Sequence, residues 1–342
     1  MQNISVVDLL TAHIRYWKHF LKMLLEVRRT YFNSLKLLTK VLREEFPVES
    51  ILKDGKHVTL KTFNAMYFIA FTRNVQNIQY NIENDLVIFS FPNSVSEKTV
   101  KLYGAVNNGD IVYGFLKEDY NRLPVKGKVI VDVGSNIGDT PIYFVLHGAT
   151  RVIGIEPFPK NYQFARKNID TNNLSDKITV ILAGCSGKSG NVTINPEYES
   201  NIESEVNNFD EGVQVPLLTL KDILEKYDVP QDSVLKMDCE GCEYETIMYA
   251  SEEILQRFSH IQIEYHFGYK NLKDKLEKCG FRVFVGKPRA TDVVNSYLET
   301  LQRIIWSPNA KKPVKISRSQ KRRHEIGYAG FIYAVREKKN DD

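Results

Sequence analysis

The sequence predicts a mixed α/β protein whose main domain is a doubly wound parallel sheet with helices on both faces. From Lys126 onward, short apolar runs such as KVIVDVG, RVIGIEP and ITVILAG alternate with stretches of helical character. Strands that alternate with helices of this length form parallel sheets that are covered on both faces. The chain has 342 residues, of which 43% are hydrophobic and 26% charged, as expected of a protein that folds around a core.

Two further segments are expected ahead of this domain. Residues 1–50 are predicted to be a helical extension, because apolar residues recur at spacings of three and four between about residues 3 and 46, and Pro47 closes the run. Residues 51–120 are predicted to be a small β-rich module, since HVTLKTF, DLVIFSF, KTVKLYG and IVYGFL are separated by turn residues. The main domain is then expected to occupy residues 121–342.

Seven strands are expected in the main domain, and the last one is expected to be antiparallel. The strand-like runs are KVIVDVG, RVIGIEP, ITVILAG, SVLKMD, HIQIEYH, FRVFVG and GYAGFIYAV. No helix separates the last two runs, which permits the seventh strand to return antiparallel. A basic insert at residues 287–327 joins them, and its KKPVKISRSQKRRHE stretch carries seven Lys or Arg before Glu325.

A glycine-containing turn after the first strand predicts a nucleoside site. It runs from Asp132 to Asp139, and Gly134 and Gly138 permit a tight turn and a close approach of the backbone. In a doubly wound sheet, ligands bind beyond the carboxyl ends of the strands, and the first strand-to-helix turn is the usual anchor. Glu156 ends the second strand about 20 residues later, where an acid accepts hydrogen bonds from ribose hydroxyls.

The charge of this turn favours S-adenosylmethionine as the ligand over NAD. A dinucleotide turn reads G-x-G-x-x-G so that a pyrophosphate can lie on bare amides. Here Asn136 takes the place of the middle glycine, and Asp132 and Asp139 would repel a pyrophosphate. S-adenosylmethionine carries no phosphate and presents an ammonium and a sulfonium instead.

The chain from about Val129 to Arg336 resembles the FkbM family of S-adenosylmethionine-dependent methyltransferases. The resemblance is carried, in order, by VDVGSNIGDT, GIEPFPKNYQFARKNIDTNN, PLLTLKDIL, LKMDCEGCEYETI, and IQIEYH with KCGFRVFV. It implies a class I methyltransferase (Rossmann-like) fold, a seven-stranded sheet with an antiparallel last strand, and methyl transfer that typically goes to a hydroxyl oxygen. The donor-binding residues that it implies are Asp132, Gly134, Asn136, Gly138 and Glu156.

Two further residues are expected near the adenine of the donor. Phe158 follows Glu156 closely enough to pack on the ring, and Ser186 lies in the turn after the third strand, where the adenine edge is usually met. Simple packing is an equally open interpretation for Phe158 and for the neighbouring Cys185.

Three side chains at the carboxyl ends of the fourth and fifth strands are the catalytic candidates: Asp238, Glu264 and His266. Methyl transfer to a hydroxyl needs an in-line acceptor and a destination for the hydroxyl proton. An imidazole that titrates near the working pH suits a base, although His266 as a mere strand cap stays open. Asp238 has a second use, to hold the donor ammonium or a divalent cation together with Glu240 and Glu264; the spacing does not require a metal, and none is predicted.

Two of the four cysteines form a C-x-x-C, Cys239 and Cys242. A zinc site is excluded because Cys185 and Cys279 do not form a second pair. A redox dithiol stays open, since the pair follows a strand and precedes a helix. The matching family motif, D-x-E-G-x-E, has both cysteines at its variable positions, where free thiols that pack as small apolar groups are expected.

Composition and charge give the predicted compartment and partners. Four cysteines in so long a chain favour a reducing compartment, and neither a signal peptide nor a run of about 18 apolar residues is visible, so a cytoplasmic protein is predicted. The net charge is only +4, but the basic helix and the basic insert leave an anionic acceptor, a nucleic acid and peripheral membrane contact open.

The acceptor itself is not identified by the sequence. The leading prediction is a hydroxyl of a small molecule, a glycan or a lipid, and the alternative is an RNA such as tRNA. An NAD-dependent oxidoreductase is the competing class of enzyme, which the missing middle glycine disfavours. The oligomeric state is not predicted.

Overall fold

The computed structural model describes residues 4–43, 45–91, 98–109, 111–195, 211–291, 293, 294, 296 and 327–337. Most of the basic insert predicted at residues 287–327, including KKPVKISRSQKRRHE, lies outside the described residues.

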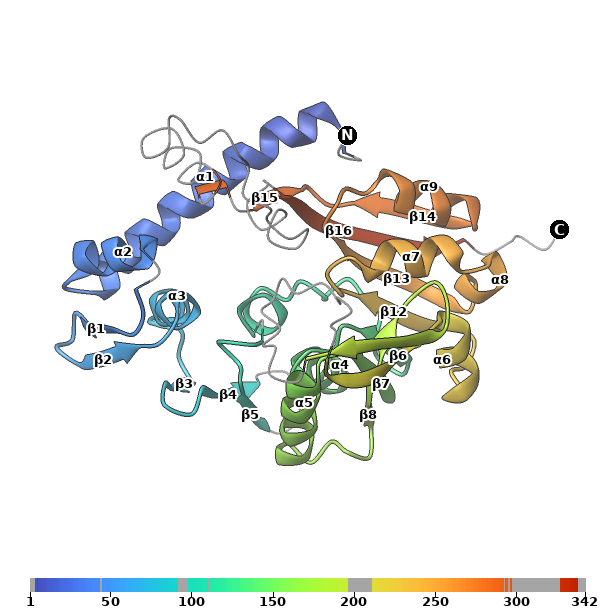
Figure 1. The fold of residues 1–342 in the computed structure, drawn as a ribbon, viewed down its shortest axis with the longest axis horizontal. Coiled ribbons are helices and arrows are strands. Elements are labelled where there is room, and N and C mark those ends of the chain that lie inside the picture. The colour runs from blue at the N-terminus through green and yellow to red at the C-terminus, as the bar shows by residue number, and fades with distance from the viewer. Residues whose placement is uncertain are drawn as a thin grey trace.

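The large sheet confirms the predicted mixed α/β class. Its strand order is β14 (Phe281–Val285), β16 (Gly327–Arg336), β13 (Phe258–Tyr265), β12 (Ser233–Met237), β6 (Val129–Val133), β7 (Arg151–Glu156) and β8 (Ile178–Leu182) (Figure 1). The neighbours from β13 to β8 are parallel, whereas β16 is antiparallel to both β13 and β14, as predicted for the last strand. An eighth strand, β15 (Arg289–Thr291), pairs with β16 and was not predicted, because three residues are too few to show a period.

Two apolar clusters cover the two faces of this sheet. Alternate residues of one strand belong to different clusters: Ile130 of β6 faces one side with α4 (Asp139–Leu146) and α5 (Pro159–Thr171), whereas Val131 faces the other. The second side is covered by α6 (Leu220–Lys226), α7 (Cys242–Tyr249), α8 (Glu252–Leu255) and α9 (Lys270–Lys278) (Figure 1). The period of two along each strand therefore forms a core on both faces, as the sequence predicted.

A small separate sheet follows β8 and was not predicted. Its strands, in the order β10-β11-β9, are β10 (Gly190–Ile194), β11 (Val213–Leu218) and β9 (Gly184–Cys185). Val192, Ile194 and Val215 of this sheet form an apolar cluster with Phe158.

The predicted single helix over residues 3–46 is wrong in one respect, because the structure has two helices, α1 (Val6–Thr30) and α2 (Ser34–Leu42). Tyr31 is fully buried between them, and its hydroxyl donates to the Met66 carbonyl at 3.1 Å. Asn33 accepts from the Ile51 amide and donates to the Glu49 carbonyl, so the chain bonds across to strand β1 (Val48–Ile51) instead of continuing the helix.

The segment between α2 and the main domain contains β1 (Val48–Ile51), β2 (His57–Leu60), α3 (Phe63–Thr72), β3 (Ile78–Asn81), β4 (Leu86–Phe91) and β5 (Lys98–Tyr103). Helix α3 was not predicted, although the Thr62 side chain caps it by accepting from the Ala65 amide. The IVYGFL run was predicted as a strand, and this is wrong: residues Val112–Leu116 form a π-helix, because short apolar runs have no period that separates strand from buried helix. The predicted boundaries at residues 50 and 120 stay predictions.

Two asparagines, one in the last turn of α5 and one that caps its C-terminus, fix this N-terminal segment to the main domain. The Asn168 side chain accepts from the Tyr103 amide at 2.7 Å and donates to the Tyr103 carbonyl at 3.0 Å. The Asn172 side chain makes the same pair of bonds to Lys101, at 3.0 and 2.7 Å. These amides pair with the edge of β5 as a neighbouring strand would, which satisfies its exposed backbone groups.

Candidate functional site

The glycine turn, residues 132–139, is in direct contact with Asp238, the residue that follows β12. Gly134 and Gly138 have φ values of 80° and 82°, and Asn136 has a φ of 46°. A Cβ on Gly134 would lie 1.7 Å from the carbonyl oxygen of Asp238, so only glycine fits there. The Asp238 amide in turn donates to the Val133 carbonyl at 2.9 Å. The ends of β6 and β12 therefore bring the predicted donor turn next to a predicted catalytic acid.

The amides of the turn are used to hold its own shape. Those of Gly134 and Ser135 both donate to the Ile155 carbonyl at 3.0 Å, and that of Gly138 donates to the Ser135 carbonyl at 2.8 Å. The Asn136 amide donates to the Glu156 carboxylate at 2.8 Å. Four amides of the turn, those of Gly134, Ser135, Asn136 and Gly138, therefore already have acceptors within the protein.

Glu156 is suited to bind the ribose of S-adenosylmethionine. It is only 3% exposed, and its two oxygens accept from the amides of Asn136 and Phe158 at 2.8 and 3.0 Å. Burial raises the pKa of Glu156 to about 7, against the lowering effect of these two amides. Each oxygen keeps a further lone pair, so the carboxylate can still accept from ribose hydroxyls.

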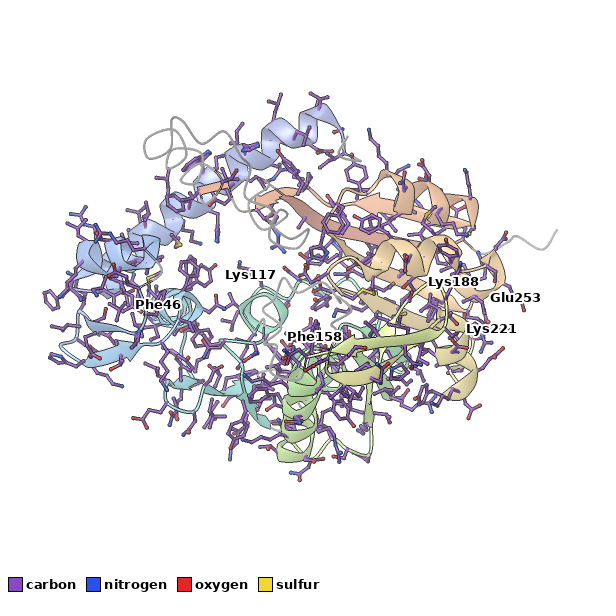
Figure 2. The ribbon with its side chains drawn as sticks, in the orientation of Figure 1. Phe46, Lys117, Phe158, Lys188, Lys221 and Glu253 are labelled. Carbon is purple, nitrogen blue, oxygen red and sulfur yellow. A yellow bond between two sulfur atoms is a disulfide. The ribbon has the colours of Figure 1, made fainter. Side chains whose placement is uncertain are left out.

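The other predicted donor-site side chains have partners within the protein. Asn136 donates to the Asn108 carbonyl and accepts from the Asn161 side chain, at 2.6 Å in the second case. The Phe158 ring, at the start of α5 (Figure 2), belongs to the apolar cluster of the small sheet. The Ser186 hydroxyl donates to Glu245 at 3.0 Å. These contacts fit structural roles, and nothing in them tests a contact with the donor.

Asp132 is fully buried and forms an ion pair with Lys236, which the sequence did not single out. The Lys236 ammonium lies 3.0 Å from the Asp132 carboxylate and donates to the Gly134 carbonyl at 2.8 Å. Thr140 donates to the second oxygen of Asp132. Burial alone would lower the pKa of Lys236, but the Asp132 and Asp238 carboxylates hold it above its usual value, so the ammonium stays charged. Asp132 therefore fixes the turn through Lys236 and Thr140, and these contacts do not test its predicted role in donor binding.

His266 lies among three carboxylates. Its Nε2 is 3.2 Å from Glu240 and 3.9 Å from Asp238, and its Nδ1 is 3.5 Å from the fully buried Glu243. The Glu243 carboxylate also accepts from the amides of Cys239 and Gly241 at 2.9 and 2.8 Å, which fixes the turn that carries Glu240. Atoms of Asp238, Glu240 and His266 lie within 4.8 Å of one another, close enough to share a divalent cation, which would have to displace a proton from the ring.

The carboxylates determine the protonation of His266. Burial alone would lower its pKa, but Glu240 and Glu243 outweigh burial and hold the pKa of His266 well above its usual value. The pKa of Glu243 is lowered, because the hydrogen bond and charge of His266 and the Cys239 amide outweigh the effect of burial. The two carboxylates thus favour the imidazolium form of His266, and this form has to lose its proton before the ring can accept another.

Glu264 approaches the same cluster from β13. Arg289, on the unpredicted strand β15, donates to its carboxylate, and Glu264 is 9% exposed. Burial raises the pKa of Glu264, as does the nearby Asp238, against the opposing effect of Arg289. The structure therefore brings Asp238, Glu264 and His266 together, as the prediction of adjacent strand ends requires.

Three side chains of this site were missed by the sequence reasoning: Lys236, Glu243 and Arg289. A lysine inside the apolar SVLKMD run was a signal for the first, because a buried cation needs a partner. Glu243 was noted only as part of a motif. Nothing in the sequence connects Arg289 with Glu264, because strand β15 is too short to recognise.

The expectation of free thiols at Cys239 and Cys242 is wrong, because the structure joins the two in a disulfide. The turn between them folds back through Glu240 and Gly241, both at positive φ, and this brings the two Cα atoms to 5.5 Å. Cys185 and Cys279 are free and buried. The disulfide closes the turn that carries Glu240. Disulfides are typical of oxidising compartments, whereas the cysteine content of the sequence predicted a reducing one.

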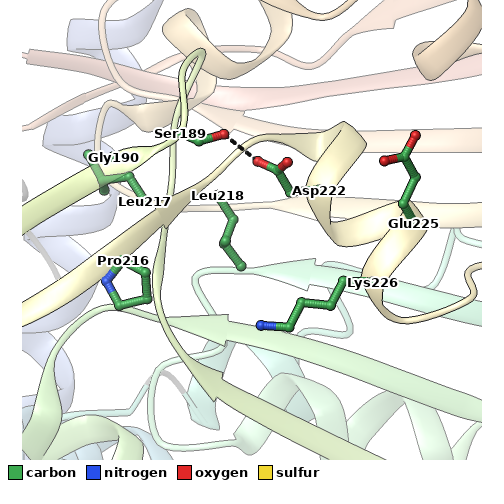
Figure 3. A pocket seen from close by; sticks show the side chains of 8 residues that line it. All are labelled: Ser189, Gly190, Pro216, Leu217, Leu218, Asp222, Glu225 and Lys226. Atoms are coloured by element: carbon green, nitrogen blue, oxygen red, sulfur yellow. Dashed lines mark hydrogen bonds between the residues drawn. The ribbon is translucent and has the colours of Figure 1, made fainter.

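A hollow of about 580 Å³ lies elsewhere on the surface (Figure 3). Residues of β10, β11 and α6 line it, and none of the predicted site residues is among them. Its Ser189 hydroxyl donates to Asp222, which also closes the capping box of α6 with Thr219 (Figure 3). The polar groups of this hollow hold the start of α6 in place. The better candidate site is the acidic cluster, which consists of Asp238, Glu240, Glu243 and Glu264 around His266.

Comparison with known proteins confirms the predicted resemblance to the FkbM family over residues 132–283. The model of the family described as "Methyltransferase FkbM domain" matches residues 132–283. The ribosomal protein L11 methyltransferase of Carboxydothermus hydrogenoformans is 46% identical over 55 residues, which are 16% of this chain and 18% of that protein. Uncharacterized protein 158B of Sulfolobus islandicus rod-shaped virus 1 is 26% identical over 160 residues, which are 46% of this chain and 73% of that protein.

Solved structures similar to this chain include two in complex with S-adenosyl-homocysteine or AdoMet, both with low sequence identity. M. capricolum TrmK in complex with S-adenosyl-homocysteine is 14% identical with a TM-score of 0.36, over 66% of this chain and 69% of that one. M. jannaschii TYW2 in complex with AdoMet is 15% identical with a TM-score of 0.35, over 76% of this chain and 90% of that one.

The Lys236–Asp132 pair can be tested by breaking it from one side. Lys236→Met should lower the free energy of unfolding by about 3–5 kcal/mol, because it leaves the Asp132 carboxylate buried and unpaired. The double variant Asp132→Asn/Lys236→Met should recover most of this loss. Urea unfolding measures both, with Lys221→Met as the control, since Lys221 is 63% exposed on α6 (Figure 2) and should change stability by less than about 0.5 kcal/mol. Equal losses in the single and double variants would contradict the assignment.

The protonation of His266 can be tested through the pH dependence of stability. A raised pKa means that His266 stabilises the fold fully below its unfolded pKa of about 6.5, and that this contribution is lost as pH rises through the folded pKa. The difference in unfolding free energy between the parent protein and His266→Gln should therefore shrink from about pH 6 to pH 10. His260→Gln is the control, because burial lowers the pKa of His260 and the slope should have the opposite sign below about pH 6.5. A difference for His266 that grows with pH would show a lowered pKa instead.

Proposed function

We propose, on the premise that the chain carries a methyltransferase FkbM domain at residues 132–283 and is therefore an S-adenosylmethionine-dependent methyltransferase, that it methylates a hydroxyl oxygen of a small molecule, a glycan or a lipid. The observation that carries this proposal is the meeting of Asp238, Glu264 and His266 beside the glycine turn. When bound, S-adenosylmethionine would supply an electrophilic methyl group: a hydroxyl oxygen in line with the carbon–sulfur bond would bond to the methyl carbon as that bond breaks, and S-adenosylhomocysteine would leave.

The donor half of the proposed site is formed by the turn and by Glu156. Glu156 accepts hydrogen bonds from the ribose hydroxyls through those oxygen lone pairs that the Asn136 and Phe158 amides do not use. The nearby carboxylates of Asp238 and Glu240 give this edge of the sheet a negative potential. Such a potential attracts an ammonium and a sulfonium and repels a pyrophosphate.

The acceptor half is formed by the acidic cluster, in which Asp238 receives the hydroxyl proton. The Asp238 side chain is 27% exposed, more than those of Glu240 and Glu243, the other two carboxylates beside His266. The His266 ring lies 3.9 Å from the Asp238 carboxylate. The imidazolium of His266, between Glu240 and Glu243, is the positioning group that keeps these acids in place. Arg289 does the same for Glu264. A base placed within reach of the hydroxyl typically contributes about 10²–10⁴ in rate.

The alternative acceptor is an RNA such as tRNA. It rests on the basic insert, whose KKPVKISRSQKRRHE stretch lies outside the described residues, whereas the described cluster presents carboxylates to an acceptor. Carboxylates repel phosphates and favour a neutral hydroxyl. Binding of bulk tRNA that weakens steeply with added salt would favour the alternative.

Donor binding is expected to depend on Glu156. Glu156→Gln should weaken S-adenosylmethionine binding about tenfold, because an amide offers one acceptor oxygen where the carboxylate offers two. Isothermal titration calorimetry with purified protein measures this change. The control is Glu253→Gln on α8, whose side chain lies on the outer surface (Figure 2) and should leave the affinity unchanged. A folded Glu156→Gln protein with unaltered affinity would place the ribose elsewhere.

Methyl transfer is expected to depend on Asp238. The protein would be incubated with methyl-labelled donor and a cell extract that lacks its gene, and the label followed into the small-molecule, glycan, lipid and RNA fractions. Asp238→Asn should lower the rate of labelling about 10²–10⁴-fold, by far more than it weakens donor binding, because the amide cannot take the hydroxyl proton. Asp274→Asn, an exposed change on α9, is the control.

Each outcome of this labelling experiment bears on the proposal. Label in the small-molecule, glycan or lipid fraction supports it, and label in RNA selects the alternative. A protein that binds the donor but labels no fraction would count against the enzymatic function, and full activity of Asp238→Asn would remove Asp238 from its proposed role.

A further inference from the structure

Helix α1 exposes a long apolar stripe on its outer face. Seven large apolar side chains on this helix are between 41% and 71% exposed: Val6, Val7, Leu10, Ile14, Trp17, Leu21 and Leu25. From Val7 onward they recur at spacings of three and four, which places them along one side of an α-helix, and Val6 lies beside Val7 at its start. Contiguous apolar surfaces of this length are uncommon on a protein that has no partner for them.

This stripe is distinct from the face by which α1 packs on the rest of the molecule. Ala12, Met23 and Val27 are buried on the packed face, Val27 completely. Ala12 lies in a cluster with Ala290, Val293 and Tyr328. Among the described residues, the packing of α1 on the core is thus made by one face, and the outer stripe lies on the opposite, exposed face.

Positive charge borders the stripe. Lys18 and Lys22 are exposed and follow Trp17 and Leu21 by one residue each, so they line one edge of the stripe. The two acids of α1 are turned toward the protein: Asp8 accepts from Tyr269 at 2.8 Å, and Glu26 lies 3.2 Å from Arg73. The exposed side of the helix therefore combines apolar groups with cations.

We propose that the outer face of α1 docks on an anionic membrane surface. Apolar side chains that include tryptophan, bordered by lysines, are the pattern of helices that lie in the plane of a bilayer interface. The 25 residues of α1 give about 37 Å of helix for this contact. Within the described part of the chain no helix is long and apolar enough to cross a membrane, so the contact is peripheral.

A second copy of the chain is the competing occupant, because spacings of three and four also suit a coiled coil. A coiled coil pairs charges of opposite sign along the edges of its apolar seam. The edge here carries Lys18 and Lys22, and both acids of the helix are engaged on its inner side. An anionic surface complements this charge, whereas a like-charged second copy does not.

The inner face of α1 connects this docking face to the candidate site. Arg15 donates to the Pro288 carbonyl at 2.8 Å, and His13 lies 2.8 Å from the Tyr328 hydroxyl. The next residue after Pro288 is Arg289, the partner of Glu264. A membrane-bound α1 would hold strand β15, and with it the Glu264 carboxylate, at a fixed position relative to the membrane surface.

Vesicle sedimentation tests the proposal independently of any activity. The full chain is mixed with phosphatidylcholine vesicles, with or without about a third phosphatidylserine, and the bound fraction is measured. Anionic vesicles should bind the protein and neutral ones far less. Leu10→Glu/Leu21→Glu should weaken this binding at least tenfold, because charged side chains do not enter the interface, while Met248→Glu, an equally apolar to acidic change at a 45% exposed residue of α7, should not.

The lysine edge is tested by Lys18→Gln/Lys22→Gln. Loss of two cations near an anionic surface should weaken binding to the anionic vesicles about thirty-fold, with little effect on neutral ones. Because all four α1 residues are exposed, these variants should retain the parent circular dichroism and melting temperature. Absent binding, or equal binding by all variants, overturns the proposal. A dimer by light scattering that Leu10→Glu/Leu21→Glu dissociates, with no vesicle binding, would identify a second copy as the occupant.

Discussion

Lys236 lies in the middle of the large sheet, with its ammonium between the Asp132 carboxylate and the Gly134 carbonyl. A lysine that is 1% exposed is tolerable only because this carboxylate and this carbonyl replace water. The pair joins β6 to β12 at the point where both strands end. Gly134 can then lie against the Asp238 backbone, and both the donor turn and the acidic cluster take their positions from this contact.

The backbone amides of the site are held in place by hydrogen bonds within the protein, so these amides are not available to bind a ligand. Amides of the glycine turn are bonded to Ile155 and Glu156, and Glu243 holds the amides of Cys239 and Gly241. Groups that are committed in this way need no ordering when a ligand binds. What remains for a ligand is a set of carboxylate lone pairs, and that set selects hydroxyls and cations over phosphates.

The sequence predicted those parts of the site that depend on local pattern. Strand ends followed by glycine or acid are readable because parallel strands all end at one edge of the sheet, and Gly134, Glu156, Asp238 and Glu264 lie where this rule places them. The parts that it missed depend on contacts between distant segments. Arg289 reaches Glu264 from a three-residue strand, Tyr31 breaks a helix that its own neighbours would continue, and no sequence signal decides that Cys239 and Cys242 are bonded.

The same reasoning connects the N-terminal helix with the candidate site, although the helix lies outside the family match. Glu264 is buried, so its charge requires a cation, and that cation is Arg289 on an edge strand. A three-residue edge strand is too short to be rigid by its own ladder bonds. Helix α1 supplies the missing support through Arg15 at Pro288 and Ala12 against Ala290. A displacement of α1 would therefore shift Arg289 and, through it, the Glu264 carboxylate. The N-terminal extension is thus physically coupled to the candidate site.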